Sequence, residues 1–399
     1  MRGRLHYITR PILVLSVVSL FNDMASEMLY PIMPLFLESI GFSILLIGIL
    51  EGVAEMTSGL SKGYFGQLSD IRQKRLPFVH LGYALSTIAK PLFTFFTAPV
   101  WIFFVRTVDR FGKGIRTAPR DAMLSDNTTA EYKGRVFGFH RSMDTFGAVL
   151  GPLAALLFLY FYPADYNTLF LLAFIPGCIA VLFTFRLKEE KRKPKEQKVH
   201  FFSYFTYLRT TDTNSPKAND AFKKLLLGLC VFALVNSSDV LLLLKMRETG
   251  IDEKWIIGIY IFYNLVYALS ALPMGILADK MGLKPVFITG LFIFGLVYSG
   301  FIFSDSRSLF FILFFLYGLY AAMTEGIAKA WISNVVPASE TGTAIGLYTA
   351  LSSIGAFIAS SLAGWLWFAF GSAATFGLSA SMMLPLMLWF SFLRSGRKT

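Results

Sequence analysis

Carboxyl side chains occur within apolar stretches that are long enough to cross a membrane. In residues 11–37, Asp23, Glu27 and Tyr30 follow one another at spacings of four and three, which places them on one face of a helix. The next apolar stretch contains Glu55. An ionisable group at membrane depth is costly and usually faces a cavity or a partner. These acids are therefore candidates for binding protons within the membrane.

Glu27 is the leading candidate for a proton carrier, because we expect it to lie mid-helix, four residues before Pro31. A buried carboxyl group for which a proton and a substrate compete exchanges one for the other. Two alternatives stay open. Either Asp23 or Glu55 binds the proton instead, or Glu27 forms a permanent ion pair with Arg106.

Basic side chains are concentrated in the apolar stretch 99–121. Arg106, Asp109, Arg110 and Lys113 each lie three or four residues from another of the set, so they share a helix face. We expect Arg106, Asp109 and Arg110 to line a substrate cavity, with Arg106 there or at a gate. For Arg110 and Lys113 the alternative stays open that they extend to the cytoplasmic interface. The cations among them are of the type that clamps a carboxylate or phosphate group.

The second half of the chain offers polar and aromatic side chains in place of most of these charges. The candidates there for lining a substrate cavity, with Tyr30 of the first half, are Asn236, Asp239, Tyr263, Asn264, Tyr267 and Glu325. Two alternatives stay open: the tyrosines only pack between helices, or Glu325 pairs with Lys329 four residues later. The asymmetry predicts proton coupling in the first half and substrate contacts in both.

The composition indicates which elements position these residues. Of 399 residues, 55% are hydrophobic and only 16% are charged, whereas a soluble domain has about 25% charged residues. A spanning helix needs about 20 mostly apolar residues. The sequence has twelve such stretches, at 11–37, 44–68, 77–97, 99–121, 136–162, 167–187, 222–246, 254–278, 284–304, 308–334, 341–370 and 373–394. We therefore predict an all-α integral membrane protein with twelve transmembrane helices.

Lys and Arg gather at both ends of the chain, in alternate loops and in the long central segment. The intervening loops are nearly free of them, except Lys245–Lys254, which mixes both signs. The positive-inside rule therefore predicts both termini in the cytoplasm. It also accounts for the net charge of +12 without nucleic-acid binding.

The polar segment 188–221 is the one long linker between apolar stretches. It divides the chain into residues 1–187 and 222–399, with six apolar stretches each. We predict two six-helix bundles joined by this cytoplasmic linker.

The two halves repeat each other. Gly66–Asp70 (GQLSD) returns as Gly275–Asp279 (GILAD), and Gly134–Gly138 (GRVFG) returns as Gly342–Gly346 (GTAIG), at offsets of 209 and 208 residues. Two matches at nearly one offset predict that the bundles are pseudo-symmetric, related by an axis along the membrane normal.

Other classes of function lack the residues that they need. The two Cys and four His have no ligand-like spacing, so neither a disulfide framework nor a zinc site is expected. The sequence has no H-E-x-x-H motif, no paired D-x-x-x-D motifs of a magnesium-dependent prenyl transferase and no repeated filter segment of a channel. We therefore expect no enzyme activity, no cofactor and no metal centre.

These motifs resemble those of the major facilitator superfamily, and within it the twelve-helix drug:proton antiporters of prokaryotes. The family pattern G-x-L-x-D-x-R-x-(K/R)-R after the second helix is matched by Gly66, Leu68, Asp70, Arg72, Lys74 and Arg75. Gln73 departs from it, because the family has Gly there. The second copy comprises Gly275, Leu277, Asp279, Lys280, Gly282 and Lys284.

Two further helices carry the resemblance. In the fifth, the antiporter motif G-x-x-x-G-P-x-x-G appears as Gly147, Gly151, Pro152 and Ala155, with Ala for the last Gly. In the first, Pro31 and Pro34 match the P-x-x-P of such exporters, and Arg106 stands where the family has an arginine in the fourth. Asp109-Arg110 replaces the usual Gln-Gly after that arginine, which indicates different substrate contacts.

The resemblance implies gates. Those on the cytoplasmic side are expected at Gly66, Asp70, Arg72, Arg75, Asp279 and Lys280. Gly147, Gly151 and Pro152 are expected to close one side of the transporter, because a stripe of small residues lets helices approach closely.

It also implies a function. We expect a monomeric secondary transporter in a bacterial inner membrane that works by alternating access and exports an amphipathic molecule or drug in exchange for protons. The alternatives are transport or exchange of an organic anion or siderophore-like metabolite, and export of a divalent metal.

Overall fold

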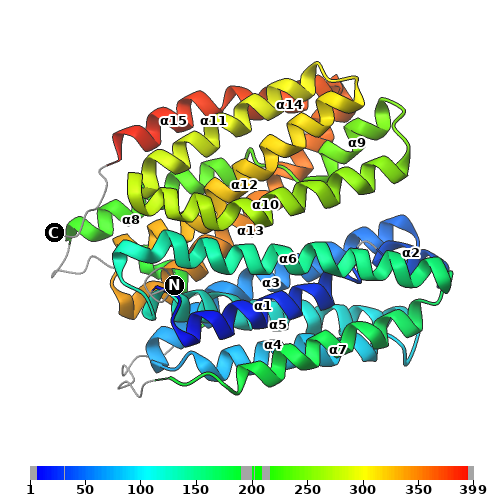
Figure 1. Cartoon of the computed structure of the whole chain (residues 1–399), viewed down its shortest axis with the longest axis horizontal. Helices are drawn as coiled ribbons and strands as arrows, with labels where there is room; N and C mark the ends of the chain where they lie inside the picture. Colours follow the sequence, from blue (N-terminus) through cyan, green and yellow to red (C-terminus); the bar gives the residue numbers. More distant parts are fainter. Residues whose placement is uncertain (1–6, 31, 190–199, 202, 209–215, 394–399) are drawn as a thin grey trace, which may run out of the picture. The chain divides into compact units, whose positions relative to one another are not determined.

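The computed structural model describes residues 7–30, 32–189, 200–201, 203–208 and 216–393 (Figure 1). Pro31 and most of the basic central segment lie outside the described residues. All regular secondary structure in the described part is helical. The helices are α1 (Arg10–Glu27), α2 (Met33–Ser39), α3 (Ile44–Arg72), α4 (Leu76–Leu92), α5 (Pro99–Asp126), η1 (Ala130–Tyr132), α6 (Lys133–Phe161), α7 (Tyr166–Thr184), η2 (Ser203–Leu208), α8 (Pro216–Ala233), α9 (Val240–Glu248), α10 (Glu253–Met281), α11 (Leu283–Ile302), α12 (Arg307–Val335), η3 (Ala338–Glu340), α13 (Thr341–Phe370), α14 (Ser372–Ser381) and α15 (Met383–Phe392).

Among the described residues, seven helical stretches are long and apolar enough to cross a membrane. They are Ala130–Phe161, Tyr166–Thr184, Gly258–Met281, Leu283–Ile302, Arg307–Val335, Ala338–Phe370 and Ser372–Phe392. The predicted number of twelve stays a prediction. α5 is not among them, and it carries several charged side chains.

Three predicted helices, 11–37, 222–246 and 373–394, are interrupted in the structure. α1 and α2 replace the first, α8 and α9 replace the second, and α14 and α15, on either side of Met382, replace the third. Pro34 lies in the first turn of α2, where the missing N–H of proline costs nothing. The second break contains the polar run 236–239 (NSSD), whose side chains compete with a helix for backbone hydrogen bonds. The prediction of continuous helices was therefore wrong, and Glu27 ends α1 instead of lying mid-helix.

The helix bounds repeat along the chain. α3 and α10 begin and end 209 residues apart, and α5 and α12, like α6 and α13, begin 208 residues apart. These offsets are those of the two sequence motifs. The duplication thus extends from the motifs to the helices that carry them.

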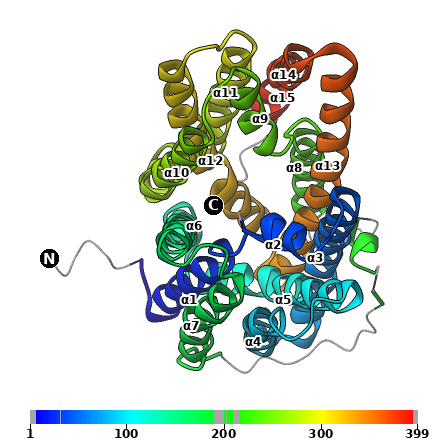
Figure 2. The same cartoon turned by 90° about the vertical axis from the view of Figure 1, so that its right-hand side faces the viewer.

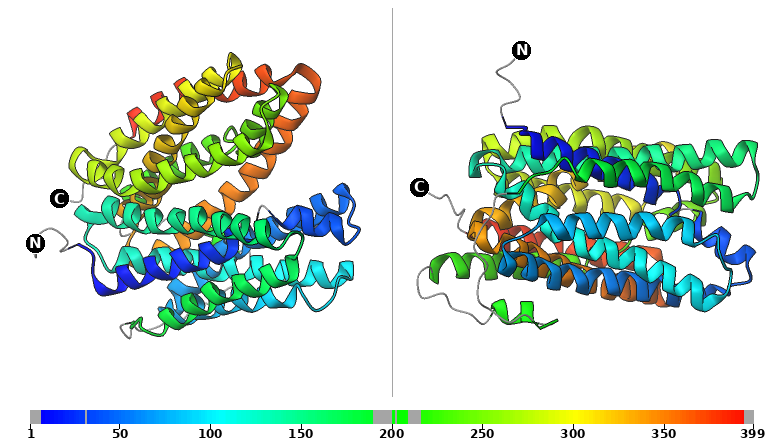
Figure 3. Two further views of the ribbon diagram at one scale, coloured as in Figure 1. Left: turned by 45° about the vertical axis from the view of Figure 1, so that its right-hand side comes forward. Right: turned by 90° about the horizontal axis from the view of Figure 1, so that it is seen from below.

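Contacts divide the chain into two compact units. Unit 1 comprises residues 1–128, 143–207 and 338–350, and unit 2 comprises 129–142, 208–337 and 351–399. The beginnings of α6 and α13 therefore belong to a different unit from the rest of each helix. In unit 1, α5 packs against both α3 and α4, while α7 packs against α1 and α4 (Figure 2). In unit 2, α12 packs against α10 and α11 (Figure 3).

Residues 204–207 of the central linker are attached to unit 1. In η2, Tyr204 is fully buried, and a Cβ added at Gly63 of α3 would collide with its ring. Burial raises the pKa of the Tyr204 phenol to about 12. The Tyr207 hydroxyl donates to Glu340 Oε2 at 2.8 Å. This aromatic segment thus packs on α3 and η3.

Candidate functional site

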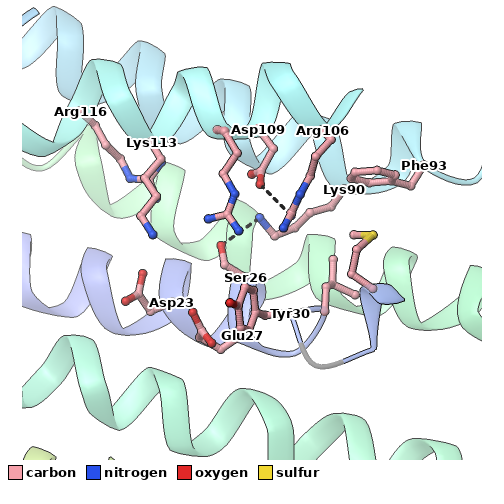
Figure 4. Close-up of a pocket in the computed structure, with 13 residues that line it drawn as sticks. Asp23, Ser26, Glu27, Tyr30, Lys90, Phe93, Arg106, Asp109, Lys113 and Arg116 are labelled. Atoms are coloured by element: carbon pink, nitrogen blue, oxygen red, sulfur yellow. Dashed lines mark hydrogen bonds and ion pairs between the residues drawn. The ribbon is translucent and has the colours of Figure 1, made fainter. Parts of the chain in front are cut away.

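A pocket in unit 1 gathers charged side chains from α1, α4 and α5 (Figure 4). Its empty space is about 520 Å³, part of it open to solvent. The residues that line it are Asp23, Ser26, Glu27, Leu29, Tyr30, Met33, Lys90, Phe93, Arg106, Asp109, Arg110, Lys113 and Arg116. Figure 4 shows Asp23 and Glu27 on one side and the side chains of α5 on the other, with Lys90 between them.

Close helix packing positions the charged face of α5. Gly112 of α5 meets Gly82 of α4 so closely that a Cβ added at Gly112 would lie 2.7 Å from the Gly82 carbonyl oxygen. On its other side, Gly114 packs against Ser61 of α3. Glycines at these crossings therefore hold the cations of α5 close to Lys90 of α4.

Two of the pocket arginines are neutralised by acids of α3. Arg106 donates to both carboxylate oxygens of Glu51, at 2.9 Å from Nε and 2.8 Å from Nη2. Arg110 Nη1 lies 3.4 Å from Glu55 Oε1. Asp109 adds a weaker pair with Arg106, at 3.7 Å. The bidentate pair with Glu51 fixes the Arg106 guanidinium group more firmly than a single contact would.

Three other cations have no carboxylate partner within ion-pair distance among the described residues. Lys90 is 2% exposed, and its Nζ donates to the Ser86 carbonyl at 3.0 Å and to Ser26 Oγ at 3.5 Å. Arg116 is also buried: Nη1 donates to Ser86 Oγ at 2.8 Å, the guanidinium lies over the Tyr83 ring, and Nε has no hydrogen-bond partner. Lys113 extends from α5 toward Asp23 (Figure 4).

The two pocket acids of α1 also make no ion pair among the described residues. Asp23 Oδ1 accepts a hydrogen bond from Asn22 Nδ2 at 3.2 Å. Glu27 ends α1 and lines the pocket, but Arg106, its predicted alternative partner, is paired with Glu51. The interpretation of Glu27 as half of a permanent Arg106 pair is therefore wrong. Glu55, the third predicted proton site, is exposed and pairs with Arg110.

A buried network lies one turn before Asp23 on α1. The Ser19 hydroxyl donates to Asp144 Oδ1 of α6 and accepts from Arg120 Nη1 at 3.0 Å. Arg120 also binds Asp121 Oδ1, at 2.9 and 3.0 Å. The network links α1, α5 and α6 behind the pocket.

The sequence analysis missed Lys90 as a site residue and did not recognise the role of Asp144 in this network. Lys90 stands within the apolar stretch 77–97, so the rule that singled out the acids of the first stretch also applies to it. Asp144 lies in the predicted helix 136–162. Its partner Ser19 belongs to a distant stretch of the sequence, which no local pattern connects to it.

Asp70, a predicted gating residue, caps the first turn of α13 within unit 1. Its carboxylate accepts from the backbone N–H groups of Gly342 at 3.2 Å and Thr343 at 2.5 Å, and from the Thr343 hydroxyl at 2.8 Å. Arg75 Nη2 lies 3.2 Å from it, and Arg75 Nε lies 3.1 Å from Asp126. Gly66 gives α13 room, because a Cβ there would strike the Gly342 carbonyl.

Asp279 makes the equivalent contacts within unit 2. It accepts from the backbone N–H groups of Gly134 at 2.8 Å and Arg135 at 3.0 Å, and from Arg135 Nε at 3.0 Å. A carboxylate at a helix N-terminus is favourable because it satisfies free N–H groups and opposes the helix dipole. Arg72 and Lys280, the other predicted gating cations, are exposed and form no ion pair in the described part of the chain.

The small residues of α6 pack on α1. Cβ atoms added at Gly147 and Gly151 would collide with the backbone of α1 around Leu20 and Met24, in the latter case at 2.5 Å. Pro152 lies next to this contact, inside α6. The stripe thus holds α6 against the helix that carries Asp23 and Glu27.

The predicted cavity residues of the second half lie in unit 2. Tyr263 packs against Tyr267 and Tyr317, and the Tyr317 hydroxyl donates to Asp239 Oδ1 at 2.6 Å. Asn264 Nδ2 donates to the Tyr260 carbonyl at 3.0 Å, and Asn236 Oδ1 is buried without a hydrogen-bond partner.

Glu325 contacts a different partner from the predicted one. It forms an ion pair with Arg141, which also donates to the Tyr267 hydroxyl at 2.6 Å. Within the described residues, no group of three or more His, Cys, Asp or Glu is arranged to hold a metal ion.

Comparison with known sequences gives matches over nearly the whole chain. The family model described as "Major Facilitator Superfamily" matches residues 15–258 and 225–399. An uncharacterized MFS-type transporter of Methanocaldococcus jannaschii is 34% identical over 366 residues, covering 90% of this chain and 89% of that protein. An uncharacterized protein of Mycobacterium tuberculosis is 24% identical over 386 residues, covering 95% and 92%.

Solved structures share the fold at low sequence identity. The human organic anion transporter MFSD10 (TETRAN) superposes with a TM-score of 0.79 at 15% identity, covering 96% of this chain and 99% of that one. The proton:xylose symporter XylE bound to 6-bromo-6-deoxy-D-glucose gives 0.71 at 15% identity, covering 98% and 97%. At this identity, the similarity is evidence for the fold alone.

Proposed function

The chain belongs to the major facilitator superfamily and is a membrane transporter, and we propose that its transport is driven by protons bound to Asp23 and Glu27. One observation carries the proposal. Both carboxyl groups line a single pocket opposite Lys113, and neither has an ion pair among the described residues. A carboxyl group in such a place changes its proton affinity when the charges around it change.

In the proposed cycle, the pocket opens to one side of the membrane at a time. The acids take up protons where these are abundant and release them on the other side. Substrate binding alters the charges in the pocket, and this alteration couples substrate to protons. A ligand shifts such an equilibrium only by its difference in affinity for the two states.

The direction of coupling follows from the charge of the substrate. A cationic substrate competes with protons for Asp23 and Glu27, which gives the antiport expected from the resemblance to drug exporters. An anionic substrate is instead favoured by protonated acids, so anion and protons move together.

The caps at Asp70 and Asp279 are proposed as gates. Each carboxylate holds the first turn of a helix, α13 or α6, through backbone N–H groups and an arginine. Breaking several charge-assisted hydrogen bonds together makes such a contact two-state. We propose that each cap breaks and re-forms once in every cycle.

Purified protein in proteoliposomes with an enclosed pH-sensitive dye tests the proton proposal. A panel of organic acids, amines and sugars is added outside, and a transported compound is expected to change the internal pH. Glu27→Gln and Asp23→Asn are each expected to abolish or strongly reduce this change. The exposed Lys224→Gln variant is the control for altered charge. Full proton movement in the Asp23→Asn, Glu27→Gln double variant would exclude these acids as the coupling site.

A further inference from the structure

Three cations of the pocket remain once the ion pairs with acids of α3 are set aside. Arg106 and Arg110 have acids of α3 as partners. That leaves Lys90, Lys113 and Arg116, which share the pocket with Asp109, Asp23 and Glu27. Lys90 and Arg116 are each at least 96% buried and are held by neutral oxygens. A buried cation is costly without an opposite charge, so these groups require a counter-ion.

Asp23 and Glu27 supply that counter-charge only while they are ionised. When both are protonated, Asp109 is the one acid left in the pocket for these three cations, so positive charge is in excess. The helix face that carries the cations thereby becomes a binding site for a negatively charged group.

Other charged groups around the two acids come from four helices, α3, α4, α5 and α6. α7, which also packs against α1, contributes none. Beyond Lys90 of α4, the charged groups are Arg106, Asp109, Arg110, Lys113 and Arg116 of α5, Asp144 of α6, and Glu51 and Glu55 of α3. Asp144 is held by Ser19 and Arg120, the two acids of α3 are held by arginines, and Asp109 lies 3.7 Å from Arg106. Asp23 and Glu27 are thus the acids of this set without a fixed cation.

We propose that the pocket binds a small organic anion through Lys90, Lys113 and Arg116, and that the anion binds together with protons on Asp23 and Glu27. The apolar lining from Leu29, Met33 and Phe93 suits a substrate with an apolar body. A carboxylate or a phosphate satisfies the cations equally well. The inference rests on the proposed proton sites and changes the expected direction: protons accompany the substrate.

Four probes with one aromatic ring test the charge of the ligand: benzoate, phenyl phosphate, benzyl alcohol and benzylamine. Binding to the detergent-purified protein is measured by thermal shift and calorimetry, with chloride salts matched for ionic strength. Benzoate or phenyl phosphate is expected to bind, and the two together tell carboxylate from phosphate recognition. The neutral and cationic probes are expected to bind at least tenfold more weakly. Lack of binding by both anions, or preference for benzylamine, would overturn the anion site.

Variants identify the residues. Lys90→Met and Lys113→Gln are each expected to weaken anion binding about ten- to hundredfold, the loss of one charge-assisted hydrogen bond. Lys113 is only partly buried, so its variant keeps the test valid if Lys90→Met does not fold. Lys224→Gln, an exposed substitution in α8, is expected to bind as the wild type does. Unchanged affinity in the Lys113→Gln and Lys90→Met variants would exclude this site.

The pH dependence separates this inference from the proton proposal. Anion affinity is expected to rise as pH falls, by up to about tenfold per pH unit for each proton taken up. In the Asp23→Asn, Glu27→Gln double variant the affinity is expected to be high and independent of pH. Anion binding that never depends on pH would leave the anion site standing and refute the proton sites. Anion affinity that falls on acidification would overturn joint binding.

Discussion

Arg72 and Arg75 lie three residues apart at the end of α3, yet only Arg75 is buried. The family pattern assigns both to the gate, whereas the structure gives ion pairs, with Asp70 and Asp126, to Arg75. Burial separates the two roles: a solvated arginine gains little from nearby acids, while a buried one cannot lose its partners without leaving charge uncompensated.

Arg75→Gln is therefore expected to destabilise the protein by about 3 kcal/mol, because it leaves Asp70 and Asp126 without their positively charged partner in a buried site. Arg72→Gln is expected to stay within about 0.5 kcal/mol of the wild type. Thermal unfolding of the two purified variants, followed by size-exclusion chromatography after heating, measures the difference. Equal losses in both variants would show that the buried ion pairs do not stabilise the protein.

For single residues, the sequence predicts which side chains are unusual within a membrane helix but not which partners they bind. The cost of charge in a membrane singles out Asp23, Glu27 and Arg106. Arg106 pairs with Glu51 and not with Glu27. Which acid it reaches depends on how α3 and α5 are rotated about their axes. Periodicity gives the face of each helix, and the packing that sets the rotation involves residues far away in the sequence.

At the scale of the helix, the pocket depends on how closely α4 and α5 approach. Lys90 belongs to α4, whereas Lys113 and Arg116 belong to α5. At the crossing of Gly82 and Gly112 the two helix backbones are in contact, so no flexible side chain can move aside to make room for a larger residue. A larger residue there must separate the helices, and with them the cations.

Gly112→Val is expected to destabilise the protein by about 2 kcal/mol or more, the usual cost of overpacking, and to weaken benzoate binding. Thermal unfolding and calorimetry measure the two effects. Gly364→Ala in α13 is the matched control, because a Cβ at that position has open space around it. Wild-type stability and affinity in Gly112→Val would contradict the close crossing.

Small residues at a spacing of four predicted the contact of α6, since Gly147 and Gly151 do pack on α1. The breaks in 11–37 and 222–246 were not predicted. Both stretches are apolar on average over about 20 residues, so mean hydropathy does not register the breaks within them. Pro34 and the polar run 236–239 were signals for these breaks, as residues that favour helix starts and turns.

For the whole molecule, duplication is what the sequence predicts best. The motif offsets of 209 and 208 residues agree with the bounds of α3 and α10 and of α6 and α13. The major facilitator fold is confirmed by the family match and by the solved structures. The cytoplasmic position of both termini depends on the distribution of Lys and Arg and stays a prediction.

Transport by the whole molecule depends on Asp23 and Glu27 changing protonation. Infrared spectroscopy of the purified protein, titrated with pH, reports the protonated carboxyl groups directly. The account predicts a protonated-carboxyl band that grows on acidification and is largely lost in the Asp23→Asn, Glu27→Gln double variant. An identical titration in the double variant and the wild type would contradict it.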